Sequence, residues 1–333
     1  MSSTGQNVIY TRNPQYWGAD LPVRRGAFNF DRVTYKLYKD KDTVVSAIRA
    51  GDFDFFPENQ MRYWCCQFIG DRFDQGVLVK EKVRHHNPRP MNGYVFNLRK
   101  PQFQDLRVRQ ALHLAYDWQW LNRMLFDNEF ERQDIYFANT PLAAQGLPSE
   151  AELKLLEPYR AELDPAVFGP MREQPSTHPP GSVRKNLAQA IALFEQAGWR
   201  NRDGVLRDAN GNPFEFEVTG RGGVLLDSYY YNLRKLGVVI HQRAADPSVD
   251  RQRLRNFDFD FTTIALREAR LPGPELVRAF HSKEADVKGS DALAGVKSRA
   301  VDALIDKLLN ASTQDELQTA AHALDRVLMH HHY

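Results

Sequence analysis

One segment of the chain, residues 92–117, changes its hydrophobic period from two to between three and four. Its first part alternates large apolar residues with smaller or polar ones, which predicts a β-strand containing Tyr94, Phe96 and Leu98. Pro101 ends that pattern, because proline has no amide hydrogen to give to a sheet. The second part predicts an amphipathic helix capped by Asp105, with its apolar stripe formed by Val108, Ala111, Leu112 and Ala115. Arg107, Arg109 and Gln110 are then expected to turn away from the core.

Other elements follow from the same patterns. A helix is expected to begin at a cap on Asp42 or Thr43 and to end at Gly51. A longer helix, 183–197, has its predicted inner face formed by Leu187, Ala190, Ile191 and Phe194. Alternation over 257–261 predicts a strand, and Thr313 with Glu316 predicts a capping box at the last helix.

The residues of the first segment are more specific than its periods. Phe96-Asn97, then Pro101 and Phe103, then Val108-Arg109-Gln110-Ala111-Leu112, resemble the hinge-and-helix signature of family-five solute-binding proteins. These are the oligopeptide, dipeptide and nickel receptors of bacterial ABC importers. The phrase 12–17 also resembles that family, and the closing helices from Val301 resemble most closely its YejA-type oligopeptide branch. The resemblance implies an α/β, periplasmic-binding-protein-like fold of type II with two lobes.

The resemblance also implies a domain division. Residues 1–95 correspond to the first lobe leading to the hinge, and residues 96–333 to the second lobe, with a Pro-rich irregular segment at 127–182. A chain of 333 residues, 42% of them apolar, is long enough for two domains. Residues 1–6 have neither region of a signal peptide, although the resemblance implies a periplasmic receptor. Compared with the members of that family, the chain resembles one truncated at both ends, with the second lobe nearly whole and only part of the first.

Net charge and hydropathy exclude some classes of partner, and the positions of the two cysteines predict their redox state. A net charge of +2, from 44 basic and 42 acidic residues, is not that of a nucleic-acid binder. No apolar run of about 18 residues occurs, so we predict no membrane span. The resemblance implies a monomer that reaches the membrane only through a permease. Cys65 and Cys66 are neighbours, and a disulfide between them would close a strained ring, so two free thiols are expected.

The resemblance places ligand contacts in the loop from Thr262 to Pro274. Glu268 is a candidate to pair with the amino terminus of a peptide, and Arg267 or Arg270 is a candidate to hold a carboxylate bidentately. Each of these three side chains can instead be a solvated loop charge. His86, Tyr94 and Asn97 are further ligand-binding candidates, because they lie near the implied hinge.

No catalytic residues, metal ligands or cofactor are predicted. Asp52 with Asp54, and Asp258 with Asp260, are acidic pairs on expected strands, and such pairs do not by themselves separate two pKa values for acid–base work. Neighbouring histidines, as in His85-His86 and His330–His332, rarely share one metal. Nucleophile-elbow, HExxH and P-loop motifs do not occur in the sequence, so we expect a protein that is not an enzyme.

The function implied by the resemblance is that of the substrate-binding component of a bacterial ABC importer. Two lobes would close on an oligopeptide, about a hinge near residues 87–98, and deliver it to the permease subunits. Three alternatives stay open: a receptor for a non-peptide ligand such as a metal complex, haem or a sugar, a hydrolase that uses the carboxylate pairs, and a fragment that binds nothing.

Overall fold

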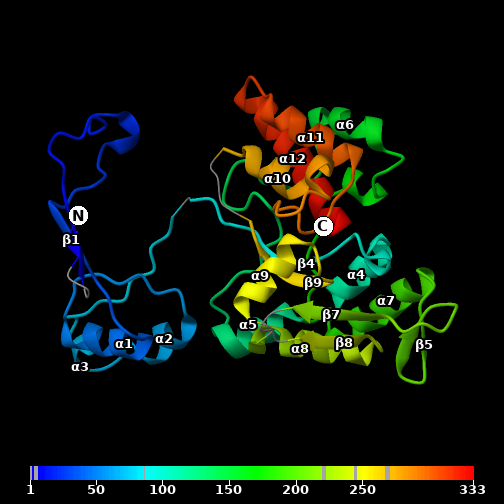
Figure 1. Ribbon diagram of the computed structural model, residues 1–333, viewed down its shortest axis with the longest axis horizontal. Helices are drawn as coiled ribbons and strands as arrows, with labels where there is room; N and C mark the ends of the chain where they lie inside the picture. Colours follow the sequence, from blue (N-terminus) through cyan, green and yellow to red (C-terminus); the bar gives the residue numbers. More distant parts are fainter. Residues whose placement is uncertain (1, 4–6, 86, 220–222, 244–245, 267–270) are drawn as a thin grey trace. The chain divides into compact units, whose positions relative to one another are not determined.

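The computed structural model describes residues 2–3, 7–85, 87–219, 223–243, 246–266 and 271–333 (Figure 1). The chain divides into two units, Met1–Val83 and Arg84–Tyr333. The division therefore lies about a dozen residues before the predicted boundary at 95/96. The reason is that strand β4 (Asn92–Phe96) pairs with β9 (Phe261–Ala265), far along the second unit. The correspondence of the two units to lobes stays a prediction.

The first unit contains a small antiparallel sheet in the order β1-β2-β3 and short helices. Its strands are β1 (Ser2–Ser3), β2 (Asn7–Thr11) and β3 (Arg32–Lys36), and its helices are η1 (Pro22–Arg24), α1 (Lys41–Ala50), α2 (Met61–Cys66) and α3 (Asp71–Asp74). Asp40, and not Asp42 or Thr43, caps α1, because its carboxylate accepts a hydrogen bond from the backbone N–H of Thr43 at 2.8 Å. Gly51 ends α1 in the left-handed region, as predicted.

Apolar packing in this unit is sparse. The buried cluster consists of Val45, Tyr63 and Phe68, against which a few half-buried side chains pack. Every residue of β3 is exposed, and so is Trp17, at 82%. The unit therefore buries little apolar surface for its length.

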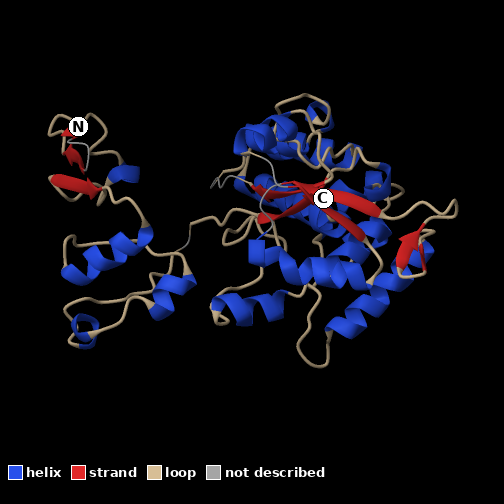
Figure 2. Ribbon diagram, turned by 60° about the horizontal axis from the view of Figure 1, so that its bottom comes forward, coloured by secondary structure: helices blue, strands red, loops and turns tan. Residues whose placement is uncertain are grey.

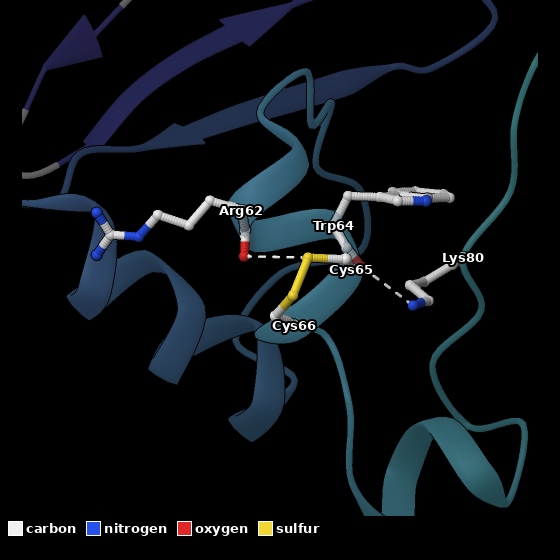
Figure 3. Close-up of a disulfide and its surroundings, with 5 residues drawn as sticks. All are labelled: Arg62, Trp64, Cys65, Cys66 and Lys80. Atoms are coloured by element: carbon white, nitrogen blue, oxygen red, sulfur yellow. Dashed lines mark hydrogen bonds between the residues drawn. A yellow bond between two sulfur atoms is a disulfide. The ribbon is translucent and has the colours of Figure 1, made fainter. Parts of the chain in front are cut away.

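The two cysteines form a disulfide with each other at the end of α2 (Figure 3). The expectation of two free thiols is therefore wrong. The Cα atoms are 3.7 Å apart, the spacing of neighbouring residues in a chain. Next to this bond, Lys80 Nζ donates a hydrogen bond to the carbonyl oxygen of Trp64 and lies over its ring.

The second unit is built on a four-stranded sheet in the order β4-β9-β7-β8 (Figure 2). β4 pairs antiparallel with β9, while β7 (Glu215–Thr219) lies parallel to both β9 and β8 (Val239–Arg243). A separate hairpin joins β5 (Arg200–Arg202) to β6 (Val205–Arg207). The strand predicted over 257–261 begins only at Phe261, because Phe257 has a φ of 57° and cannot extend a strand.

Helices cover both faces of this sheet, α4, α7 and α8 on one side and α10, α11 and α12 on the other (Figure 1). Alternate residues of β4 serve the two layers: Tyr94 and Phe96 pack in the first, and Val95 in the second. The predicted strand and its period of two are confirmed as far as Phe96, whereas Leu98, which was also predicted to belong to it, follows its end. The helices of this unit are η2 (Pro101–Phe103), α4 (Leu106–Leu114), α5 (Trp118–Phe126), α6 (Glu150–Leu156), η3 (Glu157–Tyr159), η4 (Pro165–Phe168), α7 (Val183–Gln196), α8 (Gly223–Lys235), α9 (Pro247–Arg255), α10 (Pro274–Phe280), η5 (Ser282–Glu284), α11 (Arg299–Leu309) and α12 (Gln314–His331).

Two side chains lie on faces that the sequence did not predict. Arg109 of α4 is 4% exposed, because its guanidinium donates to the carbonyl oxygens of His331, Phe103 and Gln104 near the ends of α12 and η2. Unpaired carbonyl groups at a helix C-terminus are favourable partners for a cation. Ile191 of α7 is exposed at 44%, while Asn186 takes a buried position on the same helix.

The Pro-rich segment 127–182 is held against α12 by polar side chains of that helix. Asp325 accepts hydrogen bonds from the backbone N–H groups of Tyr136 and Ala144. Arg326 is fully buried, and its Nε donates to Glu152 of α6 at 2.7 Å. The long connection is therefore part of the packed unit, although it contains only short helices.

Candidate functional site

A cavity of about 240 Å³ lies in the second unit beside the β4–β9 pair. Most of its lining is apolar, and its walls come from residues 88–91, 136–140 and 263–266, from Pro272, from residues of α10 between 275 and 280, and from Asp291 and Leu293. The most buried side chains of the lining are Ala279 and Phe280 at the end of α10, which are nearly inaccessible to solvent. An apolar hollow of this kind is typical of a small-molecule or peptide site.

Backbone hydrogen bonds hold three of these walls side by side. The N–H of Arg89 donates to Ala138 O at 3.1 Å, and the N–H of Leu266 donates to Met91 O at 2.9 Å. The Asn139 amide donates to the carbonyl oxygens of His85 and Asn87, at 3.0 and 2.6 Å. The entry to β4, the Pro-rich segment and the end of β9 thus form one fixed frame around the cavity.

Arg267, Glu268 and Arg270, the predicted ligand contacts, lie outside the described residues, and so does His86. The chain on either side of the loop is described, and both Leu266 and Pro272 line the cavity. The assignment of the four undescribed side chains as ligand contacts stays a prediction.

The other two predicted contacts do not line the cavity. Tyr94 stacks on Phe261, with ring centroids 5.4 Å apart, and meets Tyr116 edge-on. Burial, followed by the charge of Tyr116, raises the pKa of Tyr94. Asn97 is fully buried, and its amide donates to Phe257 O and Phe259 O while its oxygen accepts from Arg99. Both side chains hold the sheet to its neighbours, and a role in ligand binding stays a prediction.

Two acidic residues that line the cavity were missed in the sequence. Glu275 accepts a hydrogen bond from the N–H of Gly273 at 2.7 Å, and Asp291 pairs with Arg278 at 3.0 Å. Glu275 follows Pro274 at the start of α10, and an acid in a first helical turn is a signal that could have singled it out. A carboxylate beside an apolar hollow suits a ligand with a cationic group.

The predicted acidic pair Asp258 and Asp260 forms ion pairs within the protein, and the histidines form no metal site among the described residues. Asp258 pairs with Arg253, and Asp260 pairs with Lys100 and accepts from the N–H of Glu217. Among the described residues, no three His, Cys, Asp or Glu side chains are arranged to hold a metal ion. In the same ranges no helix has the length and apolar character needed to cross a bilayer.

An α/β sheet with helices on both faces and an apolar cavity at its edge can bind a small solute. The chain belongs to the bacterial extracellular solute-binding proteins, family 5, because the model of that family's middle region matches residues 2–285. The resemblance that the sequence suggested is confirmed, and so is the α/β, periplasmic-binding-protein-like fold. This family is a class of solute receptors and not of enzymes.

Relatives and solved structures agree with this assignment. A putative binding protein of Brucella melitensis is 35% identical over 329 residues, covering 98% of this chain and 54% of the relative. In Agrobacterium fabrum, a probable peptide-binding protein YejA is 34% identical (99% of this chain, 55% of the relative), and a peptidoglycan-binding protein YepA is 31% identical (99% and 55%). The chain thus spans about half the length of the curated relatives it matches.

Two solved structures share the fold at low identity. The oligopeptide-binding protein AppA of Bacillus subtilis, in complex with a nonapeptide, has a TM-score of 0.61 at 18% identity, over 99% of this chain and 57% of that one. NikA of Brucella suis, in complex with Fe(III)-EDTA, has a TM-score of 0.67 at 19% identity, over 99% and 59%. At these identities the likeness concerns the fold alone.

Proposed function

We propose that the chain is part of the substrate-binding component of a bacterial ABC importer that captures oligopeptides. The observation that carries the proposal is the apolar cavity framed by β9, the entry to β4 and α10. An extended peptide can place an apolar side chain in such a hollow and use main-chain hydrogen bonds for generic affinity. A YejA relative whose name states peptide binding supports the same class of cargo.

The acidic lining suggests how a peptide would be oriented. Glu275 or, from the neighbouring loop, Glu268 can receive the amino terminus, and the arginines of that loop can receive a carboxylate. Closure of two lobes about a hinge near residues 87–98 would then exclude water and strengthen these charge pairs. Delivery to permease subunits, periplasmic location and action as a monomer belong to the same proposal.

Calorimetry with tetraalanine tests the proposal. We expect one saturable site for the tetrapeptide and none for free alanine, because a single residue cannot fill the cavity and bond along the chain. Thr263 is exposed on β9 and lines the cavity, so Thr263→Trp should fill the hollow and weaken binding at least about tenfold. Thr34→Trp, on the exposed strand β3, is the matched control and should bind as the unmodified chain does.

Non-peptide cargo is the second candidate, because the fold is shared with a protein solved in complex with Fe(III)-EDTA. The same titration with Fe(III)-EDTA and with a nickel–histidine complex separates the two. Saturable binding of either complex, together with no heat from tetraalanine, would show that the cargo is a metal complex and not a peptide. Turnover of a peptide or glycoside panel would instead support the hydrolase.

A further inference from the structure

A cluster of basic side chains in the second unit lies apart from the cavity. It contains Arg132 and Arg172 of the Pro-rich segment, His113 at the end of α4 and His332 just after α12, with Gln174 beside them. The rings of His113 and His332 meet edge-on, with centroids 4.9 Å apart. None of these five side chains lines the cavity.

Two guanidinium groups lie within hydrogen-bond distance of the same imidazole nitrogen in this cluster. His113 Nε2 lies 3.2 Å from Arg132 Nη2 and 3.1 Å from Arg172 Nη2. The Gln174 side-chain oxygen is a second acceptor, 2.8 Å from His113 Nε2 and 3.3 Å from Arg172 Nη2. A neutral imidazole nitrogen has one lone pair and accepts one good hydrogen bond. Arg172 Nε is buried and has no hydrogen-bond partner among the residues that the structure describes. The cluster therefore holds more donors than acceptors.

Positive charge is also unbalanced here. Among the described residues, no carboxylate oxygen lies within 4.0 Å of a guanidinium nitrogen of Arg132 or Arg172. Asp117 and Asp134 act on Arg132 from farther away, and Asp117 already accepts from Trp120 and Thr177. Arg132 instead donates to the backbone oxygen of Pro175 and lies over the ring of Tyr116.

The histidines add no negative charge, and the neighbouring arginines contribute to lowering the pKa values of both. Burial, and then the charges of Arg172 and Arg132, hold the pKa of His113 well below its ordinary value. Burial, followed by Arg172 and His113, does the same to the pKa of His332. Burial and then Arg132 lower the pKa of Arg172 to about 10. Two guanidinium groups that share one imidazole repel each other unless an anion separates them.

We propose that Arg132, Arg172, His113 and Gln174 form a binding site for an oxyanion, of the carboxylate or phosphate class. An oxyanion offers several lone pairs and a negative charge, and guanidinium groups bind both classes bidentately. It would accept the donors that now converge on His113 Nε2, and it would give the buried Arg172 Nε an acceptor. This site is independent of the peptide cavity, so its test does not depend on the cargo.

Titration calorimetry of the 333-residue chain with inorganic phosphate and with acetate, at constant ionic strength set by sodium chloride, tests the site. We expect one saturable site for at least one of the two anions, and the tighter one identifies the class. Arg132→Gln and Arg172→Gln should each weaken binding at least about tenfold, the loss expected for a charged hydrogen bond. Arg160→Gln, in an exposed pair with Glu157, is the matched control and should change the affinity by less than about twofold.

Imidazole NMR of the unmodified chain gives a second readout that needs no variant to fold. The proposal expects the ring signals of His113 to shift on titration with the bound anion, because its Nε2 environment changes, while those of the exposed His178 do not. Two results would overturn it: neither anion gives a saturable heat or moves His113, or Arg160→Gln weakens binding as much as the cluster variants.

Discussion

Asn97 shows how one buried amide can determine where a strand begins. Its side chain satisfies two carbonyl oxygens, of Phe257 and Phe259, that no strand partner reaches, and its own oxygen accepts from Arg99 at 2.8 Å. Because the chain at Phe257 turns through a positive φ, those carbonyls face inward and need a donor. Sequence pattern alone could not supply this link, since it joins residues 160 positions apart.

Replacing Asn97 by alanine is expected to lower the free energy of unfolding by about 2–4 kcal/mol, because two buried carbonyl groups lose their donor. Urea denaturation followed by circular dichroism measures this. Asn310→Ala, on an exposed amide that bonds only within its own helix end, is the control and should cost much less. Equal losses for the two variants would show that the buried amide has no special role.

The buried pair of Glu152 with Arg326 predicts a pH dependence. Burial alone would raise the pKa of Glu152, but hydrogen bonds from His322 and Arg326 bring it to about 2, from an ordinary value of 4.5. A carboxyl group whose pKa is lowered by folding stabilises the protein above its unfolded pKa, and this stabilisation is lost as the pH falls from about 4.5 to 2.

Glu152→Gln is therefore expected to be less stable at pH 7 by about 3 kcal/mol, because Arg326 stays buried without its counter-charge. The difference from the unmodified chain should shrink between pH 4.5 and 2, measured by urea denaturation at each pH. Glu157→Gln, on an exposed pair, should leave the profile nearly unchanged. A difference that stays constant down to pH 2 would contradict the assignment of this window to Glu152.

At the scale of elements, the cap of α12 was predicted and is found. Thr313 Oγ1 accepts from the N–H of Glu316 at 3.2 Å, and the Glu316 carboxylate accepts from the N–H of Ser312 at 2.8 Å. The helix that it begins carries Asp325 and Arg326, which hold the Pro-rich segment. Loss of this cap is therefore expected to destabilise more than the first turn of the helix.

Thr313→Ala should lower the free energy of unfolding by about 1 kcal/mol, while Thr313→Ser, which keeps the hydroxyl, should cost only a small part of that. Thermal unfolding of the two variants measures the difference. If serine and alanine behaved alike at this position, the hydroxyl would not be the group that stabilises the helix.

Elements with strong periodicity were predicted well, and those defined by tertiary contacts were not. β4, α4 and α7 were found close to their expected positions, since their apolar residues repeat at a constant spacing. Arg109 was placed on the wrong face because its partners are carbonyl groups of other segments. The same limit applies to the candidate site: α10 lines the cavity through packing, and the only local signal is Glu275 in its first turn.

At the scale of the whole molecule, the two units differ in how much apolar surface they bury. The second has two large clusters of buried side chains on the two faces of its sheet, and the described part of the first has one cluster of three buried residues. The sequence predicted two parts but placed their boundary within the strand that the second unit uses. Pairing between distant strands determines such a boundary, and this pairing cannot be inferred from the local pattern of one sequence.

Limited digestion with chymotrypsin is expected to cut the first unit at least about tenfold faster than the second, because local opening is easier where few apolar contacts must break. Exposed aromatic side chains such as Trp17 and Phe55 offer sites there. Mass spectrometry of the fragments over time measures the order of cleavage. Early cuts at Phe216 or Phe261, which are 1% exposed, would contradict it.

The antiparallel pairing of β4 with β9 has a consequence during synthesis. At roughly 5–20 residues per second, the ribosome needs about 8–30 s to translate the stretch that separates the two strands. Throughout that interval the nascent chain carries an aromatic strand, with Tyr94 and Phe96, whose partner does not yet exist. Slow codons between the strands would lengthen this exposure and favour aggregation, so the timing of translation becomes part of how this unit reaches its fold.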